Sequence, residues 1–309
     1  MPPPRPLQAP LLILGPWRSG TTVMHELLHA RSGWPTPQTW QCMNPASFRL
    51  GRRPANSKSF ARPMDGLEIR HDSPQEDEFA LLSLGVPSAY RAFLMPHRLL
   101  QLKQTLDQDF WLAQDEWFAP WEDFLRGVLD SAGAYDLPLI LKSPNHSFRL
   151  RAILHRFPDA RFVWMAREAA DVFESNRKMW TAMFATHSIA DGADPDALDQ
   201  FLLHALDSCT KTLRWCMQNV PAKQWLLVDQ HELRHTAQAT VHAVWQHLGP
   251  ASSTPRSAAV SEALDRTLKG RVSRYSRQLP PDYAAVLERF QETQDLARTS
   301  FGLNRLRGA

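Results

Sequence analysis

Short apolar runs alternate with longer amphipathic stretches along this chain, and the alternation predicts an α/β protein. Runs of strand length occur at residues 11–14, 137–142, 158–167 and 224–229. Each is followed by a pattern of apolar residues three or four apart, which is typical of a helix with one buried face. The longest amphipathic segment, residues 196–219, predicts one long helix.

Aromatic residues recur through residues 97–130, which we predict to be a helix with one aromatic side. Such a stripe is more often part of a core than of a substrate pocket. Residues 31–62 are rich in Pro, Ser, Trp and Asn and predict a loop with short turns. The aromatic side chains of the stripe are Phe110, Trp111, Trp117, Phe118, Trp121 and Phe124.

The first predicted strand leads into a glycine-bounded loop with the layout of a phosphate-binding loop. Gly15 and Gly20 are separated by four residues, as in the Walker A nucleotide loop. Walker A has Lys after the second glycine, whereas this chain has Thr21 there and carries a cation inside the loop, Arg18. A guanidinium offers paired donors to a tetrahedral oxyanion, so the loop predicts a phosphate or sulfate site rather than a Mg-nucleotide site. Its candidate ligand-binding residues are Arg18, Ser19, Gly20, Thr21 and Thr22.

Composition excludes several classes of protein. Of 309 residues, 43% are hydrophobic and 22% are charged, which is ordinary for a globular chain of one large α/β domain or two small ones. The net charge of +3 is too small to indicate a nucleic-acid partner. We expect residues 1–10 to be a flexible Pro-rich segment rather than a signal peptide, and no run has the length of a membrane span.

The three cysteines form neither a disulfide framework nor a pattern of metal ligands. Cys209 and Cys216 lie seven residues apart in a helical pattern, which separates them by about 10 Å. We therefore expect a reducing, cytoplasmic setting and no bound metal. A homo-oligomer is left open.

Three consecutive acids, Glu76, Asp77 and Glu78, begin a predicted helix. Ser73 is placed as its N-cap and Pro74 at its first position, with Glu76 at the capping-box position. A cap does not require two further acids. Glu76 or Glu78 is therefore a candidate general base or substrate-orienting carboxylate, and helix capping is the alternative interpretation.

Two more candidate sites stand at the ends of predicted strands. Lys142 ends one strand and His146 follows four residues later, at the sheet edge where open α/β folds bind ligands. Arg167 ends the next strand, and Ser175 lies in the helix that follows, so the two offer a guanidinium and a hydroxyl to a second phosphate. A structural histidine and a surface salt bridge are the alternatives.

A cationic segment near the C-terminus, residues 268–277, also contains hydroxyl groups and one aromatic residue. Its Lys269 and Arg271 are candidates to close over a phosphorylated nucleotide. A solvated basic loop is the alternative.

Three motifs together resemble the PAPS-dependent sulfotransferase family. They are a Gly-x-x-Arg-Ser-Gly-Thr-Thr loop at residues 15–22, a Leu-Lys-Ser-Pro-x-His strand end at residues 141–146, and Arg167 followed eight residues later by Ser175. The resemblance covers most of residues 11–180. It is strongest to the bacterial branch with an Arg-type loop, which is related to the tyrosylprotein and carbohydrate enzymes.

The resemblance implies a single α/β domain over residues 11–309, with a P-loop-like, three-layer fold in which helices flank a central parallel sheet. It also implies transfer of a sulfuryl group from PAPS to a hydroxyl or amine of a small-molecule or carbohydrate acceptor, with PAP as product and no metal. The many aromatic residues favour an aromatic or hydrophobic acceptor.

The same resemblance implies roles for the candidate residues. The loop would bind the 5′-phosphosulfate, with Arg18 and Lys142 stabilising charge on the transferring group. Arg167 and Ser175 would bind the 3′-phosphate. Lys269 and Arg271 match the family's C-terminal nucleotide loop only loosely. Glu168 and Ala169 stand where the family usually has Asp-Pro or Asn-Pro.

The general base stays open between Glu76, Glu78 and His146. Some relatives use a His just past the equivalent of Lys142, whereas the tyrosylprotein type uses an upstream Glu. Two other functions remain as alternatives: a P-loop kinase of small molecules, and a nucleotide-binding relative that has lost its base.

Overall fold

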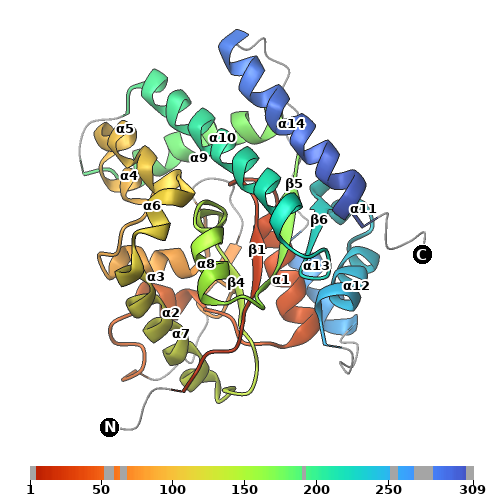
Figure 1. Ribbon diagram of the computed structural model, residues 1–309. Helices are drawn as coiled ribbons and strands as arrows, with labels where there is room; N and C mark the ends of the chain where they lie inside the picture. Colours follow the sequence, from red (N-terminus) through yellow and green to blue (C-terminus); the bar gives the residue numbers. More distant parts are fainter. Residues whose placement is uncertain are drawn as a thin grey trace.

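Four parallel strands form a central sheet in the order β4-β1-β5-β6 (Figure 1). The computed structural model describes residues 5–51, 59–62, 68–189, 193–250, 257–267 and 281–303. Two short strands, β2 (Ser59–Ala61) and β3 (Glu68–Arg70), pair antiparallel outside this sheet. The strands of the sheet are β1 (Leu11–Leu14), β4 (Ile140–Lys142), β5 (Arg161–Ala166) and β6 (Trp225–Asp229). All four apolar runs therefore contain strands, as predicted.

The helices account for most of the remaining described residues. The α-helices are α1 (Thr21–Ser32), α2 (Thr39–Met43), α3 (Asp77–Ser83), α4 (Arg91–Leu94), α5 (Leu99–Leu102), α6 (Gln108–Leu112), α7 (Phe118–Ala132), α8 (Leu150–Arg156), α9 (Ala169–His187), α10 (Pro195–Asn219), α11 (Gln230–His235), α12 (Ala237–Leu248), α13 (Ser257–Thr267) and α14 (Pro281–Phe301). The 3₁₀ helices are η1 (Pro96–Arg98), η2 (Lys103–Leu106), η3 (Asp115–Trp117) and η4 (Pro144–Phe148). None of the described helices is long and apolar enough to cross a membrane.

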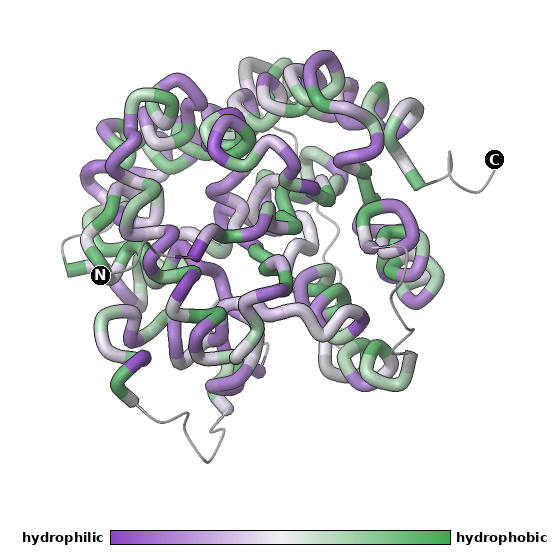
Figure 2. The backbone as a smooth tube through the Cα atoms, turned by 60° about the horizontal axis from the view of Figure 1, so that its bottom comes forward, coloured by the Kyte–Doolittle hydropathy of each residue, from purple (hydrophilic) through white to green (hydrophobic). Residues whose placement is uncertain are grey.

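Helices cover both faces of the sheet, so the predicted three-layer α/β fold is confirmed. Successive strand residues point to opposite faces: Leu12 and Trp164 belong to one buried apolar cluster, and Ile13 and Val163 to the other. Helices α1, α12 and α13 contribute to the cluster of Ile13, and α7, α8, α9, α10 and α14 to that of Leu12. In Figure 2 the outer helices alternate between hydrophobic and hydrophilic positions, as expected for helices with one buried face.

Residues 97–130 do not form the single helix that their pattern predicts. They form a series of short helices that ends in α7, and one break is at Asp107, whose backbone is extended. The carboxylate of Asp107 accepts a hydrogen bond from Ser208 of α10 (3.2 Å) and lies 2.9 Å from His204 Nε2. Tertiary contacts therefore override the helical pattern here. The stripe is still core: Trp111, Trp117, Trp121 and Phe124 are buried, and Phe110 and Phe118 pack partly buried against them.

Candidate active site

The loop between β1 and α1 is held by side chains that bind its carbonyl groups. The hydroxyl of Ser147 accepts from the Gly15 N–H (2.9 Å) and donates to the Gly15 carbonyl (3.1 Å). Asn176 of α9 donates to the carbonyl of Trp17 at 2.9 Å. These loop carbonyls are bound to the surrounding elements, whereas the backbone N–H groups at the start of α1 are the hydrogen-bond donors on the other side of the loop.

The backbone of the loop requires its glycines. Gly15 and Gly20 have φ of 126° and 98°, and Arg18 also lies in the left-handed region with φ of 69°. A Cβ on Gly15 would lie only 2.5 Å from the carbonyl oxygen of Met165. Helix α1 starts at Thr21, and the N–H groups of a first helical turn have no partner within the helix. This geometry suits a bound anion.

The loop and the Arg167 site, which the sequence predicted separately, lie together. Arg18 Nε donates to Ser175 Oγ at 3.1 Å, and Arg167 Nη1 donates to the Arg18 carbonyl at 2.9 Å. Arg167 Nη2 also lies 3.7 Å from Asp171 Oδ2, in the first turn of α9. Because β1 and β5 are neighbouring parallel strands, their carboxyl ends share one edge, which brings these residues together.

Helix α14 holds the turn after β5, a contact that sequence reasoning missed. The Gln294 side chain accepts from the Arg167 N–H (3.1 Å) and donates to the Arg167 carbonyl (3.0 Å). Gln291 accepts from the N–H of Ala169 at 3.0 Å. Two isolated glutamines on a C-terminal helix carry no signal by which the sequence could have identified them. The candidates Lys269 and Arg271 lie outside the described residues.

The acidic segment begins its helix three residues later than predicted. Helix α3 starts at Asp77, and Glu76 precedes it in an extended conformation with no capping bond from its side chain. Ser73 Oγ instead accepts from the N–H of Arg70 at 3.1 Å. Capping therefore does not account for the carboxylate of Glu76, which is available for other contacts.

Glu76 is bound to a cation at the end of β4. Its Oε1 lies 2.6 Å from Lys142 Nζ, and its Oε2 accepts from the hydroxyl of Tyr90 at 2.8 Å. Lys142 pairs in register with Ile13, two residues before Gly15, so this ion pair lies beside the glycine loop. Burial lowers the pKa of Lys142, and the adjacent Glu76 carboxylate opposes that shift.

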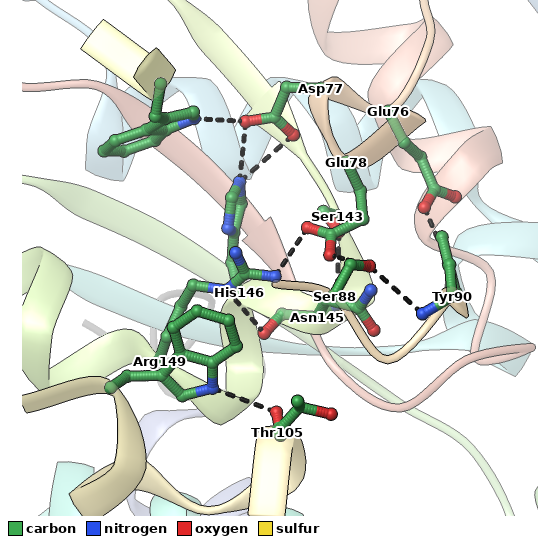
Figure 3. A network of polar contacts seen from close by, with 12 residues as sticks. Glu76, Asp77, Glu78, Ser88, Tyr90, Thr105, Ser143, Asn145, His146 and Arg149 are labelled. Carbon is green, nitrogen blue, oxygen red and sulfur yellow. Dashed lines mark hydrogen bonds and ion pairs between the residues drawn. The ribbon is translucent and has the colours of Figure 1, made fainter. Parts of the chain in front are cut away.

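Asp77 makes a separate, fully buried contact with His146 (Figure 3). The His146 Nε2 atom lies 2.8 Å from Asp77 Oδ2, and the indole N–H of Trp121 donates to the same oxygen at 2.7 Å. Burial on its own would raise the pKa of Asp77, but the charge and hydrogen bond of His146 and the hydrogen bond of Trp121 lower it. His146 thus has a structural partner in this arrangement.

Glu78 forms the third pair, with Arg149. The Arg149 Nη2–Glu78 Oε2 distance is 2.5 Å, and Ser88 donates to the other oxygen of Glu78. The guanidinium of Arg149 lies over the rings of Trp111 and Trp117, 4.2 and 4.4 Å from their centroids. The sequence did not single out Arg149, because its role depends on these distant contacts.

The three candidate bases differ in how much of each residue is exposed to solvent. Glu78 and His146 are both fully buried, whereas Glu76 is 9% exposed and touches Lys142 at the sheet edge. A general base has to reach the proton that it removes. Of these three side chains, Glu76 is the one with exposed surface. Among the described residues no group of three or more His, Cys, Asp or Glu side chains could hold a metal ion.

This chain resembles known proteins both in sequence and in structure. A model of the family described as "Sulfotransferase family" matches residues 10–253. The chain is 28% identical over 245 residues to omega-hydroxy-beta-dihydromenaquinone-9 sulfotransferase Stf3 of Mycobacterium bovis, and equally to the protein of that name from Mycobacterium tuberculosis. The match covers 78% of this chain and 62% of those relatives, so the chain spans less than two thirds of their length.

Solved structures show the same fold. Sulfotransferase STF9 from Mycobacterium avium matches with a TM-score of 0.68, and sulfotransferase STF1 from Mycobacterium tuberculosis with 0.60. Both are 18% identical, and the matches cover 94% and 93% of this chain and 77% of each of theirs. The family match spans the glycine loop, the strand end at Lys142 and the turn at Arg167, and it establishes that this chain belongs to the sulfotransferase family.

Proposed function

We propose that this chain transfers the sulfuryl group of PAPS to a hydroxyl or amine of a small-molecule or carbohydrate acceptor. The observation that carries the proposal is the contact between Glu76 and Lys142 at the sheet edge, beside a loop suited to an anion. Transfer to a hydroxyl requires a base, a cation and an anion-binding loop in one place. Membership of the sulfotransferase family supports the same class of reaction.

For the donor, we propose two binding regions on the shared edge of β1 and β5. The left-handed glycines and the open start of α1 fit the 5′-phosphosulfate. Arg167 and Ser175, which both contact Arg18, are suited to the 3′-phosphate. Lys269 and Arg271 remain proposed donor ligands. The proposed ligands of the 5′-phosphosulfate are Arg18, Ser19, Gly20, Thr21 and Thr22.

For the chemistry, we propose that Glu76 removes the proton of the acceptor group as its oxygen or nitrogen attacks sulfur. The bond between sulfur and the phosphate oxygen breaks, and its electron pair leaves with PAP. Lys142 and Arg18 stabilise the charge that develops on the transferring group. We propose a supporting role for His146, which holds Asp77 beside the base.

The acceptor is proposed to be aromatic or hydrophobic. The name of Stf3 describes a sulfotransferase of omega-hydroxy-beta-dihydromenaquinone-9, which agrees with a hydroxyl on a hydrophobic molecule. We also propose a single domain and a cytoplasmic location. The latter is supported by the three cysteines, which are buried free thiols, as expected in a reducing compartment.

Calorimetric titration with PAP, and with ATP in the presence and absence of Mg²⁺, tests the proposal. We expect tight PAP binding that does not depend on Mg²⁺, and weak ATP binding. Arg167→Ala should weaken the binding of PAP far more than that of adenosine 5′-phosphate, because only PAP carries the 3′-phosphate. Mg²⁺-dependent binding of ATP without PAP would instead indicate a kinase. Binding of neither nucleotide would refute the assignment of the loop.

A further inference from the structure

Each oxygen of the Glu76 carboxylate has its own donor. Lys142 Nζ of β4 contacts Oε1 at 2.6 Å, and the Tyr90 hydroxyl, just before α4, donates to Oε2 at 2.8 Å (Figure 3 shows the tyrosine contact). The two donors come from different elements and differ in chemistry. One is an ammonium on a flexible four-carbon stem, and the other is a neutral hydroxyl on a rigid ring.

Tyr90 is held firmly by its surroundings. The residue is 4% exposed, and its ring stacks on Phe93 with centroids 4.7 Å apart. The rings of Trp17 and Trp180 each lie 6.3 Å away, so the tyrosine also contacts the glycine loop. Its N–H donates to Ser88 Oγ at 3.1 Å. Reorienting the phenol would disturb several packed aromatic groups at once.

The phenol is also a constant donor. Burial raises the pKa of Tyr90 well above its ordinary value, and the charge of Glu76 adds to the shift. The hydroxyl therefore keeps its proton and can donate at neutral pH. The other charges that act on Tyr90 or Lys142 include those of Arg62, Asp77 and Glu78. The nearby Cys42 thiol, whose pKa burial raises, is neutral.

We propose that Tyr90 is a positioning residue that holds Oε2 of Glu76 through the reaction, which leaves Oε1 to receive the proton. The inference rests on the proposed function, in which Lys142 stabilises the transferring sulfuryl group. The Lys142 ammonium has three N–H donors, and in that function it directs donors at the transferring group, which weakens its contact with Oε1. The hydroxyl of Tyr90 then keeps the carboxylate in place.

The experiment compares Tyr90→Phe with Tyr135→Phe in the full chain. Tyr135 is a matched control because it is partly buried and packs on Arg5, away from the proposed site. Each variant is titrated with PAP and assayed with PAPS and 2-naphthol. We expect Tyr90→Phe to leave the PAP Kd and the KM for PAPS within about twofold, because the ring packing remains, and to lower kcat about tenfold.

The split between kcat and KM is a readout that lost packing alone would not produce. A loss confined to kcat in Tyr90→Phe, with both constants unchanged in Tyr135→Phe, is the result expected of a positioning residue. An unchanged kcat would overturn the role of Tyr90. A raised KM with unchanged kcat would overturn it too, because the residue would then serve donor binding.

A spectroscopic measurement decides the question if 2-naphthol is not an acceptor. The ¹³Cδ resonance of Glu76, assigned with Glu76→Gln, should shift in Tyr90→Phe at fixed pH and not in Tyr135→Phe. An unmoved resonance would contradict the proposal even where PAP binds normally. Failure of the wild-type chain to bind PAP would instead refute the proposed function, so the two failures are distinguishable.

Discussion

The buried ion pair of Glu78 and Arg149 allows a test of whether Glu78 stabilises the fold through its charge. Glu78→Gln keeps the shape of the side chain and removes its charge. Arg149 is 1% exposed and would remain charged, because a guanidinium is not deprotonated in proteins, although burial lowers its pKa. The substitution therefore leaves a buried cation without its direct ion-pair partner.

The cost follows from burial. Removing one partner of a buried ion pair destabilises a protein by about 3 to 5 kcal/mol. The rings of Trp111 and Trp117 still contact the guanidinium, which favours the lower half of that range. With an unfolding entropy of about 2.1 cal/mol/K per residue, the 309 residues correspond to about 0.65 kcal/mol/K. The midpoint of thermal unfolding should therefore fall by about 5 to 6 °C.

Chemical denaturation of Glu78→Gln measures the change, with Asp109→Asn as the matched control. Asp109 forms an ion pair with Arg151 at 3.0 Å, but its side chain is 88% exposed. We expect the control to change the free energy of unfolding by less than about 1 kcal/mol. The double variant of Glu78→Leu with Arg149→Met should recover much of the loss, because no charge is left buried. A Glu78→Gln protein within about 1 kcal/mol of wild type would refute the reasoning.

Three other predictions concern the loop and the core. Arg18→Ala should lower turnover by about 100-fold or more, as loss of an oxyanion donor does, and near-normal turnover in a transfer assay would contradict its role. Gly15→Ala should destabilise the chain, because φ is 126° and the new Cβ would meet the Met165 carbonyl; an unchanged denaturation midpoint would show that the loop tolerates a side chain. Burial, followed by the charges of Lys142 and His29, lowers the pKa of His25 well below 6.5. The unfolded chain then binds a proton near pH 6.5 that the folded chain does not, so stability should fall below that pH by up to about 1.4 kcal/mol per unit, and His25→Asn should flatten this slope in pH-dependent denaturation, whereas parallel curves would contradict it.

Local patterns were sufficient for the sheet. The four apolar runs became strands because the strands of a parallel sheet are buried on both faces, which demands apolar residues at nearly every position. The prediction of a single helix over residues 97–130 was wrong because the pattern indicates which residues are buried but not the direction in which the backbone runs between them. Trp111 donates to the carbonyl of Thr105, whereas Trp121 donates to Asp77, and Asp107 is held in an extended conformation by a hydrogen bond from α10.

Some residues of the candidate site could be proposed from local patterns, and others could not. Arg18, Lys142 and Arg167 could be proposed from the sequence because each follows an apolar run, and parallel strands place such ends on one edge. The choice among Glu76, Glu78 and His146 could not be made. It depends on where α3 begins, since a helix start turns successive side chains in different directions.

The sequence by itself determined the α/β class, the glycine loop and the cations at the strand ends. These features are encoded by neighbouring residues, through backbone freedom and hydrophobic burial. Only the tertiary structure decided that Glu76 meets Lys142 and Tyr90, and that Gln294 supports Arg167. Such contacts join residues 14 to 127 positions apart, and local periodicity carries no information about which side chains the packed core brings together.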